Sequence, residues 1–181
     1  MTTVEPIKDK KSIEKVKCIL KESGNRDYLL FTIGINSGLR ISDVLKLKVK
    51  DVRNKEFIEL YEQKTKKFKK IPITNYYKYE LENFVLQKND SEWLFPSKKG
   101  KNPITRVQAY RIIKKACTKA GINSKIGTHT LRKTFGYHFY QKEKDIALLQ
   151  YIFNHSNQAI TLRYIGITEE MINLCLKDFG L

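Results

Sequence analysis

Apolar residues recur at helical spacing along most of this chain. Between Lys10 and Glu22 they stand three or four residues apart, which is the spacing of one face of an amphipathic helix that Ser23 and Gly24 end. The same rule predicts helices over about 28–36, from 42, over 76–88, 105–120, 129–140 and 145–153, from 158, and over an amphipathic C-terminal stretch at 168–181.

Short β-branched and aromatic segments interrupt the helical pattern between residues 52 and 96. FIELYEQ and FKKIPIT flank a lysine-rich centre, which predicts an antiparallel hairpin, and Trp93–Pro96 reads as a third strand ended by proline. We therefore expect a mainly α (α+β) fold with a small three-stranded antiparallel sheet. Residues 1–9 are interpreted as a tail or linker remnant and residues 10–181 as one domain.

Charge is the strongest compositional signal. The 181 residues include 35 Lys and Arg against 19 Asp and Glu, a formal net charge of +16 with a pI near 9.7. Such an excess favours a polyanionic partner, and nucleic acid fits better than a membrane surface. The polar N-terminus and the absence of an apolar run near the roughly 18 residues of a membrane helix exclude a signal peptide and a membrane span.

The three cysteines, Cys18, Cys117 and Cys175, are single and widely separated, which fits a reducing compartment and forms neither a zinc motif nor a disulfide framework. The acidic residues are likewise scattered, so no metal or other cofactor is expected. The C-terminal Glu169 and Glu170 are explained as charges that favour a helix N-terminus.

Two short polar motifs could carry chemistry. His129 and Arg132 lie three apart behind Thr128, a residue type that caps helices, and both could face a phosphate at a helix start. Arg40 follows the turn at Ser37 and Gly38, with Asp43 close enough in sequence to hold its guanidinium. Each motif alone is typical of ordinary surface residues or of a helix-to-helix turn with one salt bridge.

Taken together, these residues form an ordered set that resembles the catalytic domain of the tyrosine recombinases, the phage integrase family. The likeness runs from about residue 26 to residue 164. Three motifs carry it: Gly38-Leu39-Arg40 followed by Ser42 and Asp43; His129-x-Leu131-Arg132; and His155 with Tyr164 nine residues later. Phe153 and Asn154 replace the Leu-Gly that the family usually has before the last histidine.

The resemblance implies a reaction and assigns roles. Tyr164 would attack a DNA phosphodiester, leaving a 3′-phosphotyrosyl link that a DNA hydroxyl can reverse. Arg40 and Arg132, with His129 and His155, would stabilise the negative charge of the transition state. Lys64, which precedes Thr65 as the family's hairpin lysine precedes a threonine, would protonate the departing 5′ oxygen, and Lys66 is the rival candidate.

The remaining hairpin lysines have two readings. Lys66, Lys67, Lys69 and Lys70 are candidate contacts to the DNA backbone, and they could equally form a solvated edge that resists aggregation. Tyr137, His138 and Tyr140 are interpreted as packing residues of the helix that begins at His129.

The expected partner is double-stranded DNA, bound by a homo-oligomer (a tetramer) in the cytoplasm of a prokaryotic or mobile-element host, in association with the nucleoid. Residues 168–181 could pass between subunits. Two alternatives stay open: a type IB topoisomerase that relaxes DNA without exchanging partners, and a non-catalytic DNA-binding accessory protein.

Overall fold

The computed structural model describes residues 4–98, 100–167, 176–177 and 179–180. In the described chain the elements are α1 (Lys10–Ser23), α2 (Asn25–Ser37), α3 (Ile41–Val44), the 3₁₀ turn η1 (Val49–Asp51), β1 (Phe57–Tyr61), β2 (Phe68–Pro72), α4 (Asn75–Val85), α5 (Arg106–Lys119), α6 (Thr130–Glu143), α7 (Ile146–Phe153) and α8 (Gln158–Ile165). The predicted succession of helices and the hairpin is confirmed as far as Ile165.

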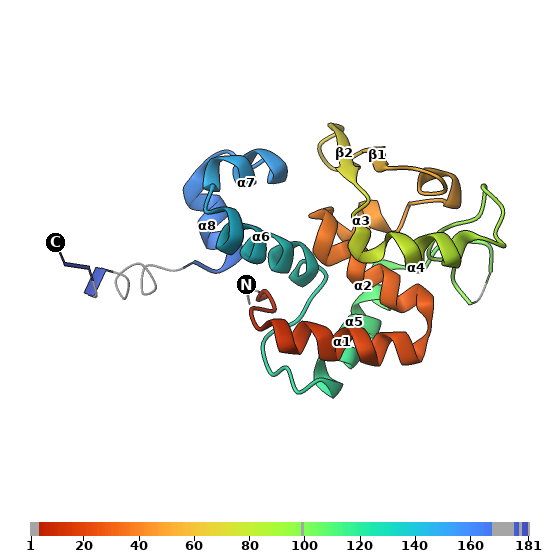
Figure 1. Ribbon diagram of the computed structural model, residues 1–181, viewed down its shortest axis with the longest axis horizontal. Coiled ribbons are helices and arrows are strands. Elements are labelled where there is room, and N and C mark those ends of the chain that lie inside the picture. The colour runs from red at the N-terminus through yellow and green to blue at the C-terminus, as the bar shows by residue number, and fades with distance from the viewer. Residues whose placement is uncertain (1–3, 99, 168–175, 178, 181) are drawn as a thin grey trace.

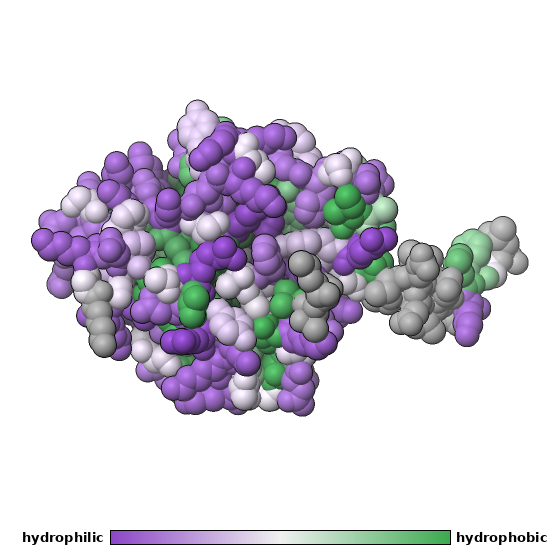
Figure 2. Space-filling view, turned by 180° about the vertical axis from the view of Figure 1, so that it is seen from behind, coloured by the Kyte–Doolittle hydropathy of each residue, from purple (hydrophilic) through white to green (hydrophobic). Residues whose placement is uncertain are grey.

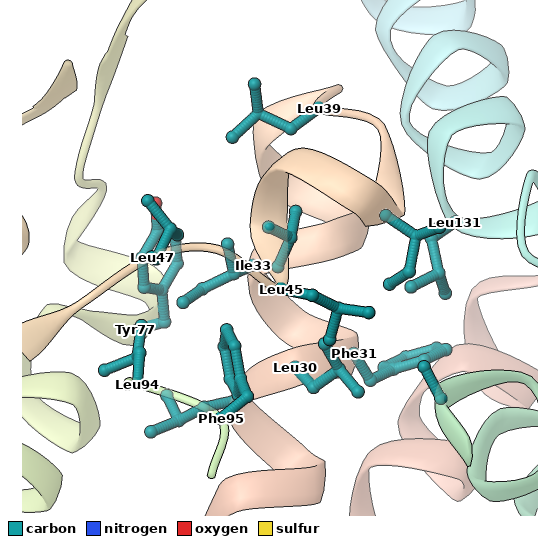
Figure 3. Packing of buried hydrophobic residues seen from close by; sticks show 14 of the residues in the cluster. Leu30, Phe31, Ile33, Leu39, Leu45, Leu47, Tyr77, Leu94, Phe95 and Leu131 are labelled. Atoms are coloured by element: carbon teal, nitrogen blue, oxygen red, sulfur yellow. The ribbon is translucent and has the colours of Figure 1, made fainter. Parts of the chain in front are cut away.

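Helix α2 lies at the centre of the larger hydrophobic core. It is apolar around most of its circumference, as expected for a helix with neighbours on every side, and it packs against α1, α4 and α6 (Figure 1). Figure 3 shows its Leu30, Phe31 and Ile33 close to Leu45, which follows α3, and to Phe95 from a segment far away in the sequence.

A close approach between α2 and α6 determines where the second catalytic motif lies. Gly34 of α2 faces Leu131 of α6, and a Cβ at Gly34 would come within 2.5 Å of Leu131 Cδ1. The absence of a side chain at this position lets the first turn of α6 lie directly on α2. Leu131 is thereby buried in the larger core, next to Arg132 in the chain.

The sheet differs from the prediction. Strands β1 and β2 pair antiparallel, from Phe57 opposite Pro72 to Tyr61 opposite Phe68, and among the described residues these two strands make up the whole sheet. The predicted third strand at Trp93–Pro96 is wrong, since this stretch forms only single bridges, Lys48 with Trp93 and Pro96 with Pro103. Proline has no N–H to extend a ladder, and the partner segment after Lys48 turns into η1.

The N-terminal stretch packs against the fold instead of forming the expected tail. Ile7 is buried in the larger core, and its backbone N–H donates to Thr134 Oγ1 at 2.9 Å. His138 Nε2 lies 2.9 Å from the Ile7 carbonyl, which gives this histidine the structural role that the sequence indicated. Residues 4–9 are therefore part of the folded domain.

Helix caps agree with the sequence in part. Thr105 caps α5 through a capping box with Gln108, as expected. The N-cap of α4 is Thr74, and the N-cap of α6 is His129 and not Thr128.

The C-terminal half of α6, together with α7 and α8, forms a second and smaller cluster around Leu149, Phe153 and Ile165. Figure 1 places these helices beside the larger body, on the side where the chain ends. Most of the predicted C-terminal helix at 168–181 lies outside the described residues. Figure 2 shows that hydrophilic side chains predominate on the face seen from behind.

Candidate active site

Arg132 is the most deeply buried of the predicted catalytic residues, with 3% of its surface exposed. Its guanidinium donates to the Gly38 carbonyl at the end of α2 and, at 3.0 Å, to the Phe153 carbonyl at the end of α7. Carbonyls at helix C-termini lack helical partners and carry partial negative charge, so they suit a buried cation. Arg132 therefore ties the larger body to the smaller cluster.

The turn that places the Gly38 carbonyl depends on glycine. Gly38 ends α2 in the left-handed conformation (φ 63°), and a Cβ there would come within 2.7 Å of the Phe135 ring. This is the cap that the sequence predicted before Arg40.

Arg40 directly precedes α3, and it forms an ion pair with a carboxylate that the sequence analysis missed. Its Nη1 lies 2.5 Å from Glu62 Oε1, and Nη1 of Arg132 lies 3.8 Å from the same oxygen. The two guanidiniums, ninety-two residues apart in sequence, are thus brought to one buried point.

Asp43 does not hold Arg40 as expected. Its Oδ1 accepts the backbone N–H of Gln63 at 3.0 Å, while its buried Oδ2 has no hydrogen-bond partner. Burial raises the pKa of Asp43 above its ordinary value, and the Glu62 charge adds to this effect. The expected ion pair is therefore replaced by Glu62, which enters from the end of β1, and Asp43 instead fixes the start of the hairpin turn.

A signal for Glu62 was present in the sequence. Ile58 and Leu60 point inward along β1, and the strand period of two puts Glu62 on the same side. A carboxylate at an inward position needs a cation, so the alternation could have marked Glu62 as a buried charge, without saying which cation it meets.

The nucleophile candidate, Tyr164, lies close to both His129 and His155. Tyr164 Oη is 3.4 Å from His129 Nδ1, and the Tyr164 ring is 5.1 Å from the His155 ring. His155 Nδ1 is held at 3.0 Å from Thr161 Oγ1, one turn before Tyr164 on α8. Five residues predicted from the sequence thus converge at the junction of α3, α6, α7 and α8: Arg40, Arg132, His129, His155 and Tyr164.

The pKa shifts set the resting proton states of this group. Burial lowers the pKa of His129 and of His155 below 6.5, and nearby cations lower both further, Arg106 and Arg132 for the first and Arg132 and Arg40 for the second. Burial raises the pKa of Tyr164 above 10.0, although Arg132 and Arg40 oppose that rise. At neutral pH a phenol therefore faces neutral imidazoles able to accept its proton.

Lys133 is a second residue that sequence reasoning passed over. Its Nζ lies 5.1 Å from the centre of the Tyr164 ring, and burial lowers its pKa while Glu5 raises it. It directly follows Arg132, and that adjacency is the one signal that could have drawn attention to it.

The hairpin lysines divide into three groups. Lys64 and Lys66 are exposed in the turn, and Lys66 has a left-handed backbone (φ 57°). Lys69 Nζ donates to the Ile152 carbonyl at 2.9 Å, and Lys67 Nζ to Asn154 Oδ1 at 3.4 Å, so these two bridge the hairpin to α7. Lys70 pairs with Glu59 at 3.1 Å on the exposed face.

Asn154 and Phe153 explain the departure from the Leu-Gly pattern. Asn154 ends α7 with φ 53° and ψ 45°, the left-handed conformation that asparagine tolerates best after glycine. Its side-chain Nδ2 donates to Glu62 Oε2 at 3.3 Å, and the Phe153 ring lies 4.4 Å from the Arg132 guanidinium carbon and 5.5 Å from the Tyr164 ring. The left-handed turn before His155 is therefore kept, and Phe153 and Asn154 add contacts to the site residues around it.

An open basic groove borders the site at His129. It has a volume of about 1070 Å³ and runs between α5 and the segment before α6, with Arg106, Lys114, Lys125 and His129 along it. Among the described residues, no three His, Cys, Asp or Glu side chains gather as metal ligands would, and no described helix is both long and apolar enough to span a membrane.

The family comparison decides what this arrangement is. The model of the phage integrase family matches residues 9–171. The chain belongs to the phage integrase family.

Relatives of this integrase chain include the probable integrase/recombinase YoeC of Bacillus subtilis, 51% identical over 99% of both chains. The tyrosine recombinase XerA of Pyrococcus horikoshii is 30% identical over 91% of this chain and 59% of its own length. The chain thus spans nearly all of YoeC but about half to three fifths of the relatives named tyrosine recombinase.

Solved structures show the same fold as this integrase domain. XerA superimposes with a TM-score of 0.76 at 22% identity, covering 98% of this chain and 65% of that one. The catalytic domain of bacteriophage HP1 integrase gives 0.63 at 25% identity, covering 98% and 96%. XerH, solved bound to its difH substrate after cleavage, gives 0.76 at 21% identity, covering 98% and 54%. These structures show the fold alone. The family match and the relatives named integrase/recombinase and tyrosine recombinase make this chain a tyrosine recombinase, and topoisomerase or accessory roles are not favoured.

Proposed function

We propose that this chain cuts and rejoins duplex DNA through a covalent 3′-phosphotyrosine at Tyr164. The main support for this proposal is that the Tyr164 hydroxyl, the neutral imidazoles of two histidines and the guanidiniums of two arginines lie close together. These residues are His129, His155, Arg40 and Arg132. The basic groove beside His129 and the DNA-bound relatives support duplex DNA as the substrate.

The chemistry follows from the side chains. Tyr164 Oη attacks the phosphorus while its proton passes to His129, and the bond from phosphorus to the 5′ oxygen breaks. Arg40 and Arg132 stabilise the charge on the non-bridging oxygens, with His155 as a further donor or acceptor. Lys64 gives a proton to the departing oxygen, and a DNA hydroxyl reverses the sequence.

Arg132 reaches the reaction already oriented. Its two bonds to helix-end carbonyls fix the plane of the guanidinium, so little reorganisation is needed when a phosphate arrives. Arg40 has 17% of its side chain exposed, which leaves an outward edge for a phosphate oxygen.

The assembly and the location belong to the same proposal. XerH and lambda integrase are solved on DNA, the latter as a dimer. A tetramer on two DNA sites, on nucleoid or mobile-element DNA, is the arrangement that strand exchange between duplexes requires. Residues 10–181 would form the catalytic domain of that assembly, and exchange of residues 168–181 between subunits stays a prediction.

The test uses a nicked suicide substrate, from which the cleaved strand diffuses away and traps the covalent adduct. The wild-type chain should form an adduct that denaturation does not dissociate, and Tyr164→Phe should form none while shifting the same DNA in a gel. Tyr140→Phe, which removes a hydroxyl from the same small cluster, is the matched control and should form adduct normally. Adduct formation by Tyr164→Phe would overturn the assignment.

A further inference from the structure

Glu62 has no solvent exposure, and both of its oxygens have partners in the active site. Oε1 faces Arg40 at 2.5 Å and Arg132 at 3.8 Å. Oε2 accepts from Thr65 Oγ1 in the hairpin turn and, at 3.3 Å, from Asn154 Nδ2 beside His155. One carboxylate therefore joins the arginine corner, the turn that carries Lys64 and the turn that carries His155.

Stability alone does not account for an acid at this position. Burial of a carboxylate is costly even when it is paired, and a well-packed hydrophobic residue of similar volume is often neutral or more stable. Burial by itself raises the pKa of Glu62, but the bonds from Thr65 and Arg40 and the charges of both arginines outweigh it and hold the pKa below 4.5. The carboxylate is ionised at neutral pH, at a place where a phosphate will bind close by.

The burial pattern says on which side of the arginines Glu62 lies. Arg40 keeps an exposed edge, while Glu62 has none. A DNA strand that approaches from solvent meets Arg40 before it can meet the carboxylate. Glu62 is therefore behind the arginines and does not fill the place of the phosphate.

We propose that Glu62 is a positioning residue that aims Arg40 at the scissile phosphate and holds the Lys64 turn against the His155 turn. The proposal rests on the function proposed above and adds a residue that none of the three motifs contains. Lys67 and Lys69 reinforce the same contact, since both reach from the hairpin to the end of α7.

Two effects of Glu62 oppose each other, and this makes the proposal testable. Its geometry favours cleavage, whereas its negative charge repels the phosphate. Glu62→Gln keeps the shape and removes the charge, and an amide cannot accept from all of its present donors. We expect single-turnover cleavage to slow about tenfold or more, while the DNA dissociation constant stays equal or falls.

The matched control is Glu59→Gln, three residues earlier on β1. It makes the same change of charge at an exposed ion pair with Lys70 and touches none of the active-site turns. It should cleave within about twofold of wild type, as surface pairs contribute little. Equal cleavage by Glu62→Gln and Glu59→Gln would overturn the proposal.

Thr65→Val is a second variant in case Glu62→Gln does not fold. It removes one donor to Oε2 and leaves the ion pair with Arg40 intact, so it loosens chiefly the Lys64 turn. Cleavage should slow severalfold on ordinary DNA and return to the wild-type rate on DNA with a bridging 5′ sulfur, which leaves without a proton. A general structural defect would slow both substrates alike and would overturn the proposal.

The wild-type reaction separates the two levels of the argument. Without a wild-type adduct, the proposed function itself fails. If the wild-type chain forms the adduct, and thermal melting shows that Glu62→Gln and Thr65→Val are folded, then unchanged cleavage rates in both variants would contradict only the positioning role.

Discussion

The two hydrophobic clusters differ in how firmly they support the catalytic residues they carry. Arg40, Asp43 and Glu62 belong to segments of the larger core, which gathers residues from Ile7 to the start of α6. His155 and Tyr164 lie on a cluster that has three fully buried hydrophobic residues within the described part of the chain, Leu149, Phe153 and Ile165. Arg40 thus lies on the larger core, whereas the nucleophile candidate Tyr164 lies on the smaller cluster, which has fewer buried contacts to hold it in place.

This difference suggests how the site is assembled. Segments with few buried contacts open more readily than core helices, so the smaller cluster is the part expected to adjust when DNA binds. Arg132 spans the junction through the Gly38 and Phe153 carbonyls, and the Glu62 bond to Asn154 crosses it a second time. The following predictions test this division.

The largest effect is expected at the junction itself. In Arg132→Lys a single ammonium takes the place of a guanidinium that bonds two carbonyls and can bind a phosphate through two N–H groups. The rate of cleavage should therefore fall about a hundredfold or more. The control is Arg53→Lys, because Arg53 also donates to two carbonyls, that of Val85 at the end of α4 at 2.6 Å and that of Lys88 just after it, but lies away from the site. A similar cleavage rate in the two folded variants would contradict the role of Arg132.

The next effect concerns the proton donor of the hairpin. Lys64→Ala should slow cleavage about a hundredfold on ordinary DNA and regain the wild-type rate with a bridging 5′ sulfur. Lys66→Ala, at the neighbouring exposed position, should do neither. The reverse result would assign the acid to Lys66.

A smaller and local effect is expected within the small cluster. Gly136→Ala would place a Cβ 2.7 Å from Phe153 and Ile165, an overpacking that typically costs about 1–3 kcal/mol. Hydrogen exchange should speed up in α7 and α8 and stay unchanged in α2. Gln141→Ala, at an exposed position of α6, serves as the control. Equal acceleration in α2 would show that the two clusters open together.

The smallest effect is the pH dependence of the histidines. Their folded-state pKa values lie below the ordinary 6.5, so the unfolded chain binds more protons between the two values. Their contribution to stability is complete above pH 6.5 and is lost as the pH falls through the lowered values. Thermal melts from pH 7.5 to 5 should show this decline, reduced in His129→Asn/His155→Asn. An unreduced decline would place its origin elsewhere.

The sequence by itself determined the local structure and the order of the catalytic residues. Helical spacing, the cap at Thr105, the glycine at Gly38 and the hairpin pattern depend on neighbours within a few residues, so they could be read directly. The three motifs then placed Arg40, Arg132, His129, His155 and Tyr164 in one site, and the structure brings these five together.

Only the tertiary structure decided which groups meet across long distances. Three findings depend on how segments far apart in sequence approach one another: Glu62 instead of Asp43 as the partner of Arg40, the packing of Ile7, and single bridges instead of a strand at Trp93–Pro96. Local periodicity gives the direction in which a side chain points, but the nearest opposite charge or unpaired backbone group is supplied by another segment. A buried charge takes the partner that the packed chain puts beside it, and no local pattern names that partner.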